Sequence, residues 1–173
     1  MKLAMVGLGK MGANMARRLV ADGYQVVVYD VTEGSATALA SEHSNIQAVL
    51  CLKELSEALP APRAIWLMVP HQFVDQSIED LQAAGIEKGD LIIDRGNSNF
   101  NLSKQRAAQL SERGIHFVDS GASGGVWGLE NGYSMMLGSS DEAIAILRPA
   151  LQSLAPAKDE GWGHVGPPVP GIM

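Results

Sequence analysis

The stretch Lys2–Asp30 constrains the fold of this chain more than any other part of its sequence. Residues 2–6 are a short apolar run typical of a buried strand, and they lead into a turn of six residues, Gly7-Leu8-Gly9-Lys10-Met11-Gly12. Apolar side chains then recur at helical spacing, and a second apolar run at residues 25–29 ends at Asp30. This order of strand, glycine turn, helix, strand and acid is the pattern of a dinucleotide-binding unit.

Each glycine of this turn has its own role in the predicted site. Gly7 makes a tight turn, Gly9 lets the backbone approach a pyrophosphate, and Gly12 lets the helix sit close to the strand. Unpaired N–H groups and the positive end of the helix dipole then face the phosphates. The sequence therefore predicts dinucleotide binding at residues 7–12. The alternative is a glycine turn in an α/β domain that binds no ligand.

Asp30 predicts which dinucleotide is bound. A carboxylate after the second strand accepts hydrogen bonds from both hydroxyls of an adenosine ribose, and it repels a 2′-phosphate. The residues that follow, Val31 and Thr32, provide no arginine for such a phosphate. NAD is therefore favoured over NADP as the cofactor. The alternative is that Asp30 caps a helix that starts near Thr32.

Composition and charge narrow the range of partners. The chain has 173 residues and a net charge of −6, which suits one α/β domain and disfavours nucleic acid or an anionic membrane surface as a partner. Cys51 is the one cysteine, so no internal disulfide forms. No apolar run reaches the length of a membrane span, and no cleavable signal precedes the first strand. We expect a cytoplasmic protein that binds a small molecule and no metal.

The rest of the chain alternates strands with helices. The pattern predicts further strands at residues 45–50, 64–69, 91–94, 115–119 and 133–138, and helices at residues 33–43, 51–59, 72–84, 99–113 and 141–154. This alternation predicts an α/β fold of Rossmann type, with a doubly wound and mainly parallel sheet, as one domain over residues 1–173.

Three polar or glycine-rich turns follow three of these strands. They are Met68-Val69-Pro70-His71, Asp94-Arg95-Gly96-Asn97-Ser98-Asn99 and Asp119-Ser120-Gly121-Ala122-Ser123-Gly124-Gly125-Val126-Trp127-Gly128. Because ligands bind at the carboxyl ends of parallel strands, we expect these turns to share one site. A serine hydroxyl and glycine N–H groups at residues 123–125 suit an anion, and Asn97 offers a donor and an acceptor between a nicotinamide and a substrate hydroxyl. The alternative is that these residues only form turns.

Three motifs together resemble 6-phosphogluconate dehydrogenase. They are GLGKMG at residues 7–12, IIDRGNS at residues 92–98 and SGGVWGLE at residues 123–130, and the last resembles the short, NAD-preferring decarboxylating type. The resemblance extends to about Pro167. It implies NAD-dependent oxidation of 6-phosphogluconate, a phosphorylated sugar acid, to ribulose 5-phosphate and CO2 in the pentose phosphate pathway. It also implies cofactor contacts from Val69, Pro70 and Asn97, and substrate contacts from Asn97, Ser123, Gly124 and Gly125.

Two departures bear on this resemblance. Arg95 stands where the family usually has a glycine, so it narrows the loop or adds a charge near the phosphate. The related 3-hydroxyisobutyrate dehydrogenases share the first motif and the Ser-Gly-Gly, but they carry Ser-Thr where this chain has the Gly-Asn-Ser of residues 96–98. This difference favours 6-phosphogluconate, the sugar acid, over 3-hydroxyisobutyrate as the substrate. A fragment of the hydroxyisobutyrate type is one alternative, and a non-catalytic NAD-binding module is another.

The resemblance further implies that this chain holds no catalytic residue. Such enzymes use a lysine as general base and a glutamate as acid, both beyond the position of Met173, the glutamate in an all-helical domain that also forms the dimer. Residues 168–173 depart from the family, and a shift of reading frame near codon 167 would restore its pattern. We expect a truncated domain that binds NAD without turnover and lacks most of the dimer surface. An exposed apolar patch is expected there, with Trp127 and Trp162, both predicted in loops, at its rim. The alternative is that these tryptophans cover the edge of the domain's own core.

Overall fold

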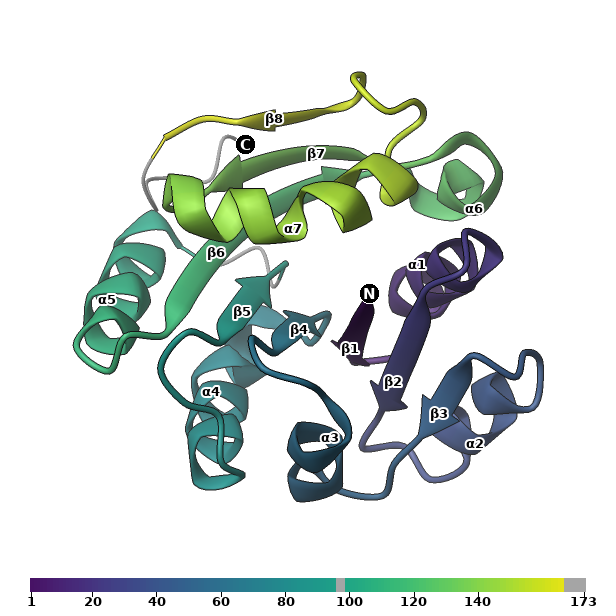
Figure 1. Ribbon diagram of the computed structural model, residues 1–173, viewed down its shortest axis with the longest axis horizontal. Coiled ribbons are helices and arrows are strands. Elements are labelled where there is room, and N and C mark those ends of the chain that lie inside the picture. Colours follow the sequence, from purple (N-terminus) through teal and green to yellow (C-terminus); the bar gives the residue numbers. More distant parts are fainter. Residues whose placement is uncertain (96–98, 167–173) are drawn as a thin grey trace.

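The strands of this protein form one twisted sheet through the middle of the molecule (Figure 1). The computed structural model describes residues 1–95 and 99–166. In chain order the strands are β1 (Lys2–Val6), β2 (Gln25–Tyr29), β3 (Ile46–Ala48), β4 (Ala64–Leu67), β5 (Leu91–Asp94), β6 (His116–Ser123), β7 (Ser134–Gly138) and β8 (Trp162–His164). They lie in the order β3-β2-β1-β4-β5-β6-β7-β8, and every neighbouring pair is parallel except β6 with β7. This confirms the predicted α/β fold of Rossmann type with a mainly parallel sheet.

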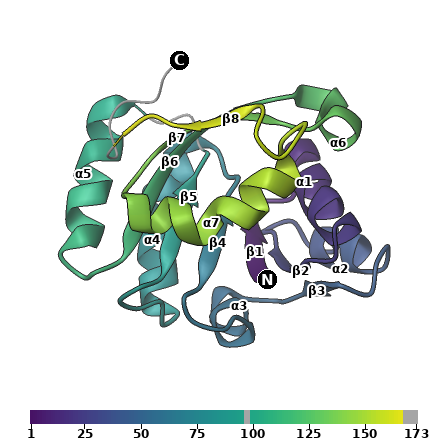
Figure 2. The same ribbon diagram turned by 45° about the horizontal axis from the view of Figure 1, so that its top comes forward.

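Helices cover both faces of the sheet (Figure 2). They are α1 (Lys10–Ala21), α2 (Ser35–Ala40), α3 (Leu52–Ala58), α4 (Val74–Ala83), α5 (Phe100–Ser111), α6 (Gly128–Asn131) and α7 (Asp141–Leu154), with the short 3₁₀ helices η1 (His71–Phe73) and η2 (Gly125–Trp127). On one face α1, α2 and α7 pack against the strands, and on the other face α3, α4 and α5 do so. Within the described ranges, no helix is long and apolar enough to cross a membrane.

The central strands contribute alternate residues to two hydrophobic cores. In β1, Leu3 and Met5 belong to the core beneath α1, whereas Ala4 and Val6 belong to the core beneath α3 and α4. A strand covered on both faces is a continuous apolar run, which explains why β1 was predictable as a buried strand.

Two predictions about the C-terminal part of the sheet were wrong. The strand predicted to end at Asp119 continues as β6 to Ser123, because β7 returns antiparallel and pairs with these additional residues. Trp162 was predicted in a loop, but it begins β8, which pairs with β7. Trp127 lies in η2 and is 65% exposed, whereas Trp162 is half-buried and its ring lies 5.2 Å from the Arg148 guanidinium.

Arg18 fastens α1 to the C-terminal part of the fold. Its Nη1 donates to the Leu129 carbonyl at 3.1 Å, its Nε to the Ser153 carbonyl at 2.9 Å, and its Nη2 to the Ala155 carbonyl at 2.8 Å. The last two carbonyls lie at the end of α7, where helical carbonyls lack partners within the helix and favour a cation. One side chain therefore joins α1 to both α6 and α7.

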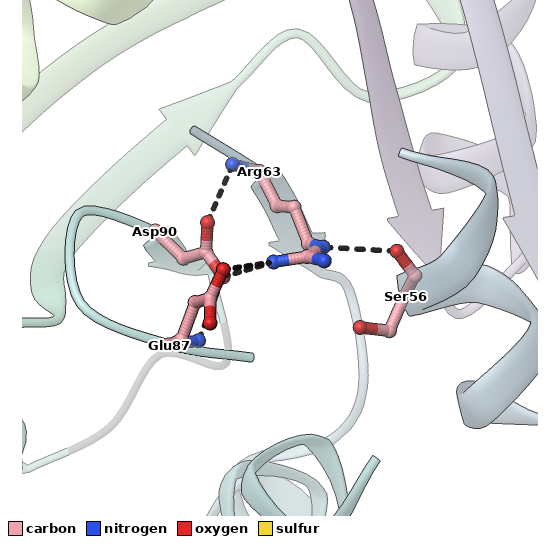
Figure 3. Close-up of polar contacts among 4 residues, drawn as sticks. All are labelled: Ser56, Arg63, Glu87 and Asp90. Carbon is pink, nitrogen blue, oxygen red and sulfur yellow. Dashed lines mark hydrogen bonds and ion pairs between the residues drawn. The ribbon is translucent and has the colours of Figure 1, made fainter. Parts of the chain in front are cut away.

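A buried ion pair holds the amino-terminal edge of the sheet together (Figure 3). Asp90 is fully buried, and its carboxylate accepts hydrogen bonds from the Arg63 backbone N at 2.7 Å, the Arg63 Nη1 at 3.0 Å and the Glu87 backbone N at 2.8 Å. The Arg63 Nε donates to the Ser56 carbonyl in α3 at 2.9 Å. These contacts join the segments that enter β4 and β5 to a helix on one face, so their role is structural.

Candidate dinucleotide-binding site

The turn of residues 7–12, called the glycine turn below, has the geometry that its sequence predicts. Gly7 has φ +95° and donates its N–H to the Tyr29 carbonyl at 3.0 Å, which joins β1 to the end of β2. A Cβ on Gly7 would lie 2.7 Å from the Met68 carbonyl oxygen, and a Cβ on Gly12 would overlap the Gly7 carbonyl oxygen. Neither position therefore has room for a side chain.

Gly9 is a glycine for a different reason. Its φ of −61° suits any residue, and a Cβ there would meet no atom within 4 Å. Gly9 is also the N-cap of α1, and no side chain caps the N–H groups that begin this helix. The turn thus presents bare backbone and a helix N-terminus toward open space, which is the arrangement that binds a phosphate group.

Asp30 fixes the glycine turn to the end of β2. Its Oδ2 accepts a hydrogen bond from the Leu8 backbone N at 2.6 Å, and its Oδ1 accepts one from the Thr32 backbone N at 2.7 Å. Asp30 does not cap the next helix, because α2 begins at Ser35 with Gly34 as its N-cap. Each carboxylate oxygen has a second lone pair, so both remain able to accept a ligand hydroxyl.

A cleft of about 290 Å³ opens beside the glycine turn and is called the glycine-turn cleft below. Its lining residues are Gly9, Lys10, Met11, Gly12, Met68, Val69, Pro70 and Arg95. Val69 and Pro70 follow β4, and Arg95 follows β5, so the cleft lies at the carboxyl ends of three neighbouring parallel strands. The structure thus brings the predicted cofactor residues Val69 and Pro70 to the glycine turn. Asn97 lies outside the described residues.

The predicted substrate residues lie at the end of β6. Ser123 is the last residue of that strand and is exposed, and Gly124 and Gly125 follow with φ values of +151° and +50°. A Cβ on Gly124 would lie 2.8 Å from the Tyr133 ring, whereas a Cβ on Gly125 would meet nothing within 4 Å. Gly124 is therefore required by packing, and Gly125 leaves the backbone accessible. The Arg95 Nη2 donates to the Ala122 carbonyl at 2.8 Å and so connects this segment with the glycine-turn cleft.

Two neighbouring groups act as structural supports. Tyr133 is fully buried beside Gly124 and Gly128, and this burial raises the pKa of its hydroxyl. Asp94, at the end of β5, lies 3.5 Å from the Nη1 of the buried Arg106, whose Nε donates to Asp75 at 2.6 Å. Sequence reasoning missed the role of Tyr133, and for Arg95 it gave a narrower loop or a charge near the phosphate. The packing of Tyr133 on Gly124 and the bond from Arg95 to Ala122 form only in the folded chain.

The strand order, the glycine turn and the tethered Asp30 define a dinucleotide-binding domain of Rossmann type. The chain belongs to the family described as the NAD binding domain of 6-phosphogluconate dehydrogenase, whose model matches residues 2–163.

Individual relatives agree with this assignment. YqeC of Bacillus subtilis, provisionally named a 6-phosphogluconate dehydrogenase, is 37% identical over 170 residues, which cover 95% of this chain and 56% of YqeC. The NAD(+)-dependent, decarboxylating 6-phosphogluconate dehydrogenase of Haloferax volcanii is 34% identical over 167 residues, which cover 96% of this chain and 54% of that enzyme. The chain therefore spans about half the length of these relatives.

Solved structures match the fold closely. The 6-phosphogluconate dehydrogenase of Plasmodium falciparum, described with its cofactor NADP+ and with its substrate 6-phosphogluconate, superposes with a TM-score of 0.86 at 26% identity over 96% of this chain and 37% of that one. A 3-hydroxyisobutyrate dehydrogenase of Mycobacterium tuberculosis superposes with a TM-score of 0.82 at 24% identity over 96% of this chain and 54% of that one. The second likeness concerns the fold alone.

Proposed function

We propose that this chain is the cofactor-binding part of a decarboxylating 6-phosphogluconate dehydrogenase, and that it binds NAD in preference to NADP. The observation that carries the proposal is the glycine-turn cleft, which is lined both by the exposed backbone of the turn and by Val69 and Pro70. The Asp30 carboxylate, bonded to Leu8 within the turn, supplies the preference for an unphosphorylated ribose.

The residues present fit a nicotinamide dinucleotide. Backbone N–H groups at the start of α1 bind the diphosphate, and the open space beside Gly9 admits it. Asp30 accepts hydrogen bonds from the ribose hydroxyls, while Val69 and Pro70 pack against the nicotinamide end. When bound, the nicotinamide supplies an acceptor for the hydride that leaves the substrate.

The substrate half of the proposal assigns the acid group of 6-phosphogluconate to the end of β6. There the exposed Ser123 hydroxyl and the accessible backbone of Gly124 and Gly125 receive a carboxylate, and Asn97 is proposed to bridge substrate and cofactor. The proton-transferring lysine and glutamate are assigned to the part of the relatives that this chain does not match. The chain alone is therefore proposed to bind cofactor without turnover.

Calorimetric titration of the purified chain tests the cofactor assignment. We expect NAD to bind more tightly than NADP; tighter binding of NADP would contradict the role given to Asp30.

Titration of acids into the NAD-saturated chain tests the substrate assignment. We expect 6-phosphogluconate to bind and 3-hydroxyisobutyrate not to bind, without any increase in NADH absorbance at 340 nm. The reverse preference would support the hydroxyisobutyrate type, and NADH formation would contradict the proposed catalytic incompleteness. NAD binding with neither acid bound would support a non-catalytic module.

A further inference from the structure

Arg95 is held in place between two strands of the carboxyl edge. Its backbone N donates to the Leu67 carbonyl at the end of β4 at 3.1 Å, and its Nη2 donates to the Ala122 carbonyl in β6 at 2.8 Å. The side chain is partly buried, and Arg95 lines the glycine-turn cleft together with Gly9 and Gly12. Its position is therefore determined at both ends.

The hydrogen bonding of this guanidinium is incomplete. The Arg95 Nε is buried and has no acceptor in the described part of the chain. Arg18 provides a contrast within the same molecule, because its Nε, Nη1 and Nη2 each donate to a backbone carbonyl. Several other buried side-chain atoms also have no partner among the described residues, but of all these atoms only the Arg95 Nε belongs to a residue that lines the glycine-turn cleft, where a ligand or water can satisfy it.

The charge of the cleft identifies the kind of ligand. Among the described residues that line it, Lys10 and Arg95 are cationic, and no lining residue is an acid. The uncapped N-terminus of α1 adds a partial positive charge on the same side. A guanidinium in such a setting binds phosphate or carboxylate oxygens well, because its planar donors match their geometry.

We propose that Arg95 binds an anionic oxygen group in the glycine-turn cleft, either a cofactor phosphate or the acid group of the substrate. The identity of the ligand rests on the proposed function, but the anion-binding role of Arg95 does not. Since Arg95 stands where the resembling family usually has glycine, this contact would distinguish this chain from the usual pattern of that family.

The test compares Arg95→Met, Arg95→Lys and Arg95→Gly with the wild-type chain. Arg113→Met is the matched control, because Arg113 is exposed just after α5, at the opposite edge of the sheet, and its replacement removes the same charge. Inorganic pyrophosphate, NAD and 6-phosphogluconate are titrated separately at several salt concentrations. Thermal unfolding of each variant verifies that it is folded.

We expect Arg95→Met and Arg95→Gly to weaken at least one of these anions by about tenfold or more, the effect of losing a charge-assisted hydrogen bond. Arg95→Lys should recover part of the affinity, and the salt dependence of binding should be shallower in Arg95→Met than in the wild type. If Arg95 served only to bond the Ala122 carbonyl, the salt dependence of anion binding would be the same in Arg95→Met as in the wild type. Restoring the positive charge with Arg95→Lys would then not by itself restore affinity. Arg113→Met should bind like the wild type.

The three ligands separate the possible outcomes. Weakened pyrophosphate and NAD would assign Arg95 to the cofactor phosphates, whereas weakened 6-phosphogluconate alone would assign it to the substrate acid. Pyrophosphate binding that depends on Arg95 in a chain that binds no NAD would support the inference while contradicting the proposed function. Folded Arg95 variants that bind all three anions as the wild type does would overturn the inference, as would a wild-type chain that binds none of them.

Discussion

The two edges of the sheet carry polar groups of different kinds. At the amino-terminal edge, the Asp90 carboxylate accepts hydrogen bonds from Arg63 and Glu87, and Arg63 also donates to the Ser56 carbonyl. At the carboxyl edge, the N-terminus of α1 has no capping side chain, and within the described residues the buried Arg95 Nε has no acceptor. At the amino-terminal edge the polar groups named here bond to one another. At the carboxyl edge the named donors remain available to a ligand in the glycine-turn cleft.

This contrast shows how a ligand site differs from a structural ion pair. Both edges contain buried charge, and a buried carboxylate such as Asp90 is an obvious candidate for a functional group. The backbone N–H groups of Arg63 and Glu87 and the Arg63 side chain satisfy the Asp90 carboxylate, so its burial is explained without a ligand. Unpaired donors that line a cleft, as the Arg95 guanidinium and the start of α1 do, are the more specific sign of a binding site.

The largest effect is expected from breaking the amino-terminal edge. Asp90→Ala leaves the Arg63 guanidinium without its buried carboxylate, so the free energy of unfolding should fall by about 3–5 kcal/mol. Urea denaturation followed by circular dichroism measures this. Glu87→Ala is the control, because Glu87 is exposed and lies 3.5 Å from Arg63, and it should cost less than about 1 kcal/mol. Weaker NAD binding by folded Asp90→Ala protein would show that the two edges are coupled.

The glycine turn allows stability and binding to be separated at two nearby positions. Gly12→Ala forces a methyl group into the Gly7 carbonyl, so it should cost about 1–3 kcal/mol of stability and also abolish NAD binding. Gly9→Ala meets no atom of the protein, so stability should change by less than about 0.5 kcal/mol while NAD binding is lost. Denaturation and calorimetry on both variants test this. Normal NAD affinity in Gly9→Ala would exclude the diphosphate from this space.

Asp30 tests the cofactor end of the carboxyl edge. Asp30→Ala should weaken NAD by about 1–3 kcal/mol, the contribution of charge-assisted hydrogen bonds, and should weaken NADP less or improve it. Glu112→Ala is the matched control, since Glu112 is exposed after α5 at the opposite edge. Equal losses for NAD and NADP would indicate that Asp30 acts only by holding the Leu8 N–H and the glycine turn.

The smallest effect is a dependence on pH. The hydrogen bond from Arg106 holds the pKa of Asp75 below its ordinary range. Such a carboxyl contributes stability that is complete above its unfolded pKa, roughly 3.9, and that is lost as the pH falls through the lower folded pKa. Asp75→Asn should therefore be less stable than the wild type at pH 7, and the difference should vanish in acid. Asp75 is 66% exposed, so solvent screening keeps the difference below about 1 kcal/mol. A difference that persists at pH 2 would point to another cause.

The sequence predicted the parts of the fold whose signals are local. The bounds of β1, β2 and α7 were predicted as the structure has them, because both strands are short apolar runs and α7 is an amphipathic stretch, whose N-cap the structure shows to be Ser140. The end of β6 was not predictable, because Ser-Gly-Ala-Ser at residues 120–123 has turn composition and becomes strand only through pairing with β7. β8 is too short to show a period.

The candidate site divides in the same way. The convergence of the glycine turn with Val69 and Pro70 was predictable, because the carboxyl ends of parallel strands share one edge. The bond from Arg95 to Ala122 and the Tyr133 ring beneath Gly124 depend on tertiary packing, and no local pattern in the sequence indicates them.

The contacts of Arg18 have a consequence for the order in which the protein is assembled. Arg18 and Ala155 lie 137 positions apart in the sequence. During synthesis, α1 therefore leaves the ribosome long before residue 155 has been added and this bond can form. Contacts between distant positions form late, because the chain entropy of closing such a loop is lost before the contact stabilises anything. The contacts of α1, the first helix to be synthesised, with the end of α7 are thus among the last to form. We expect that the nucleotide site of a nascent chain is not stably formed until α7 has been synthesised.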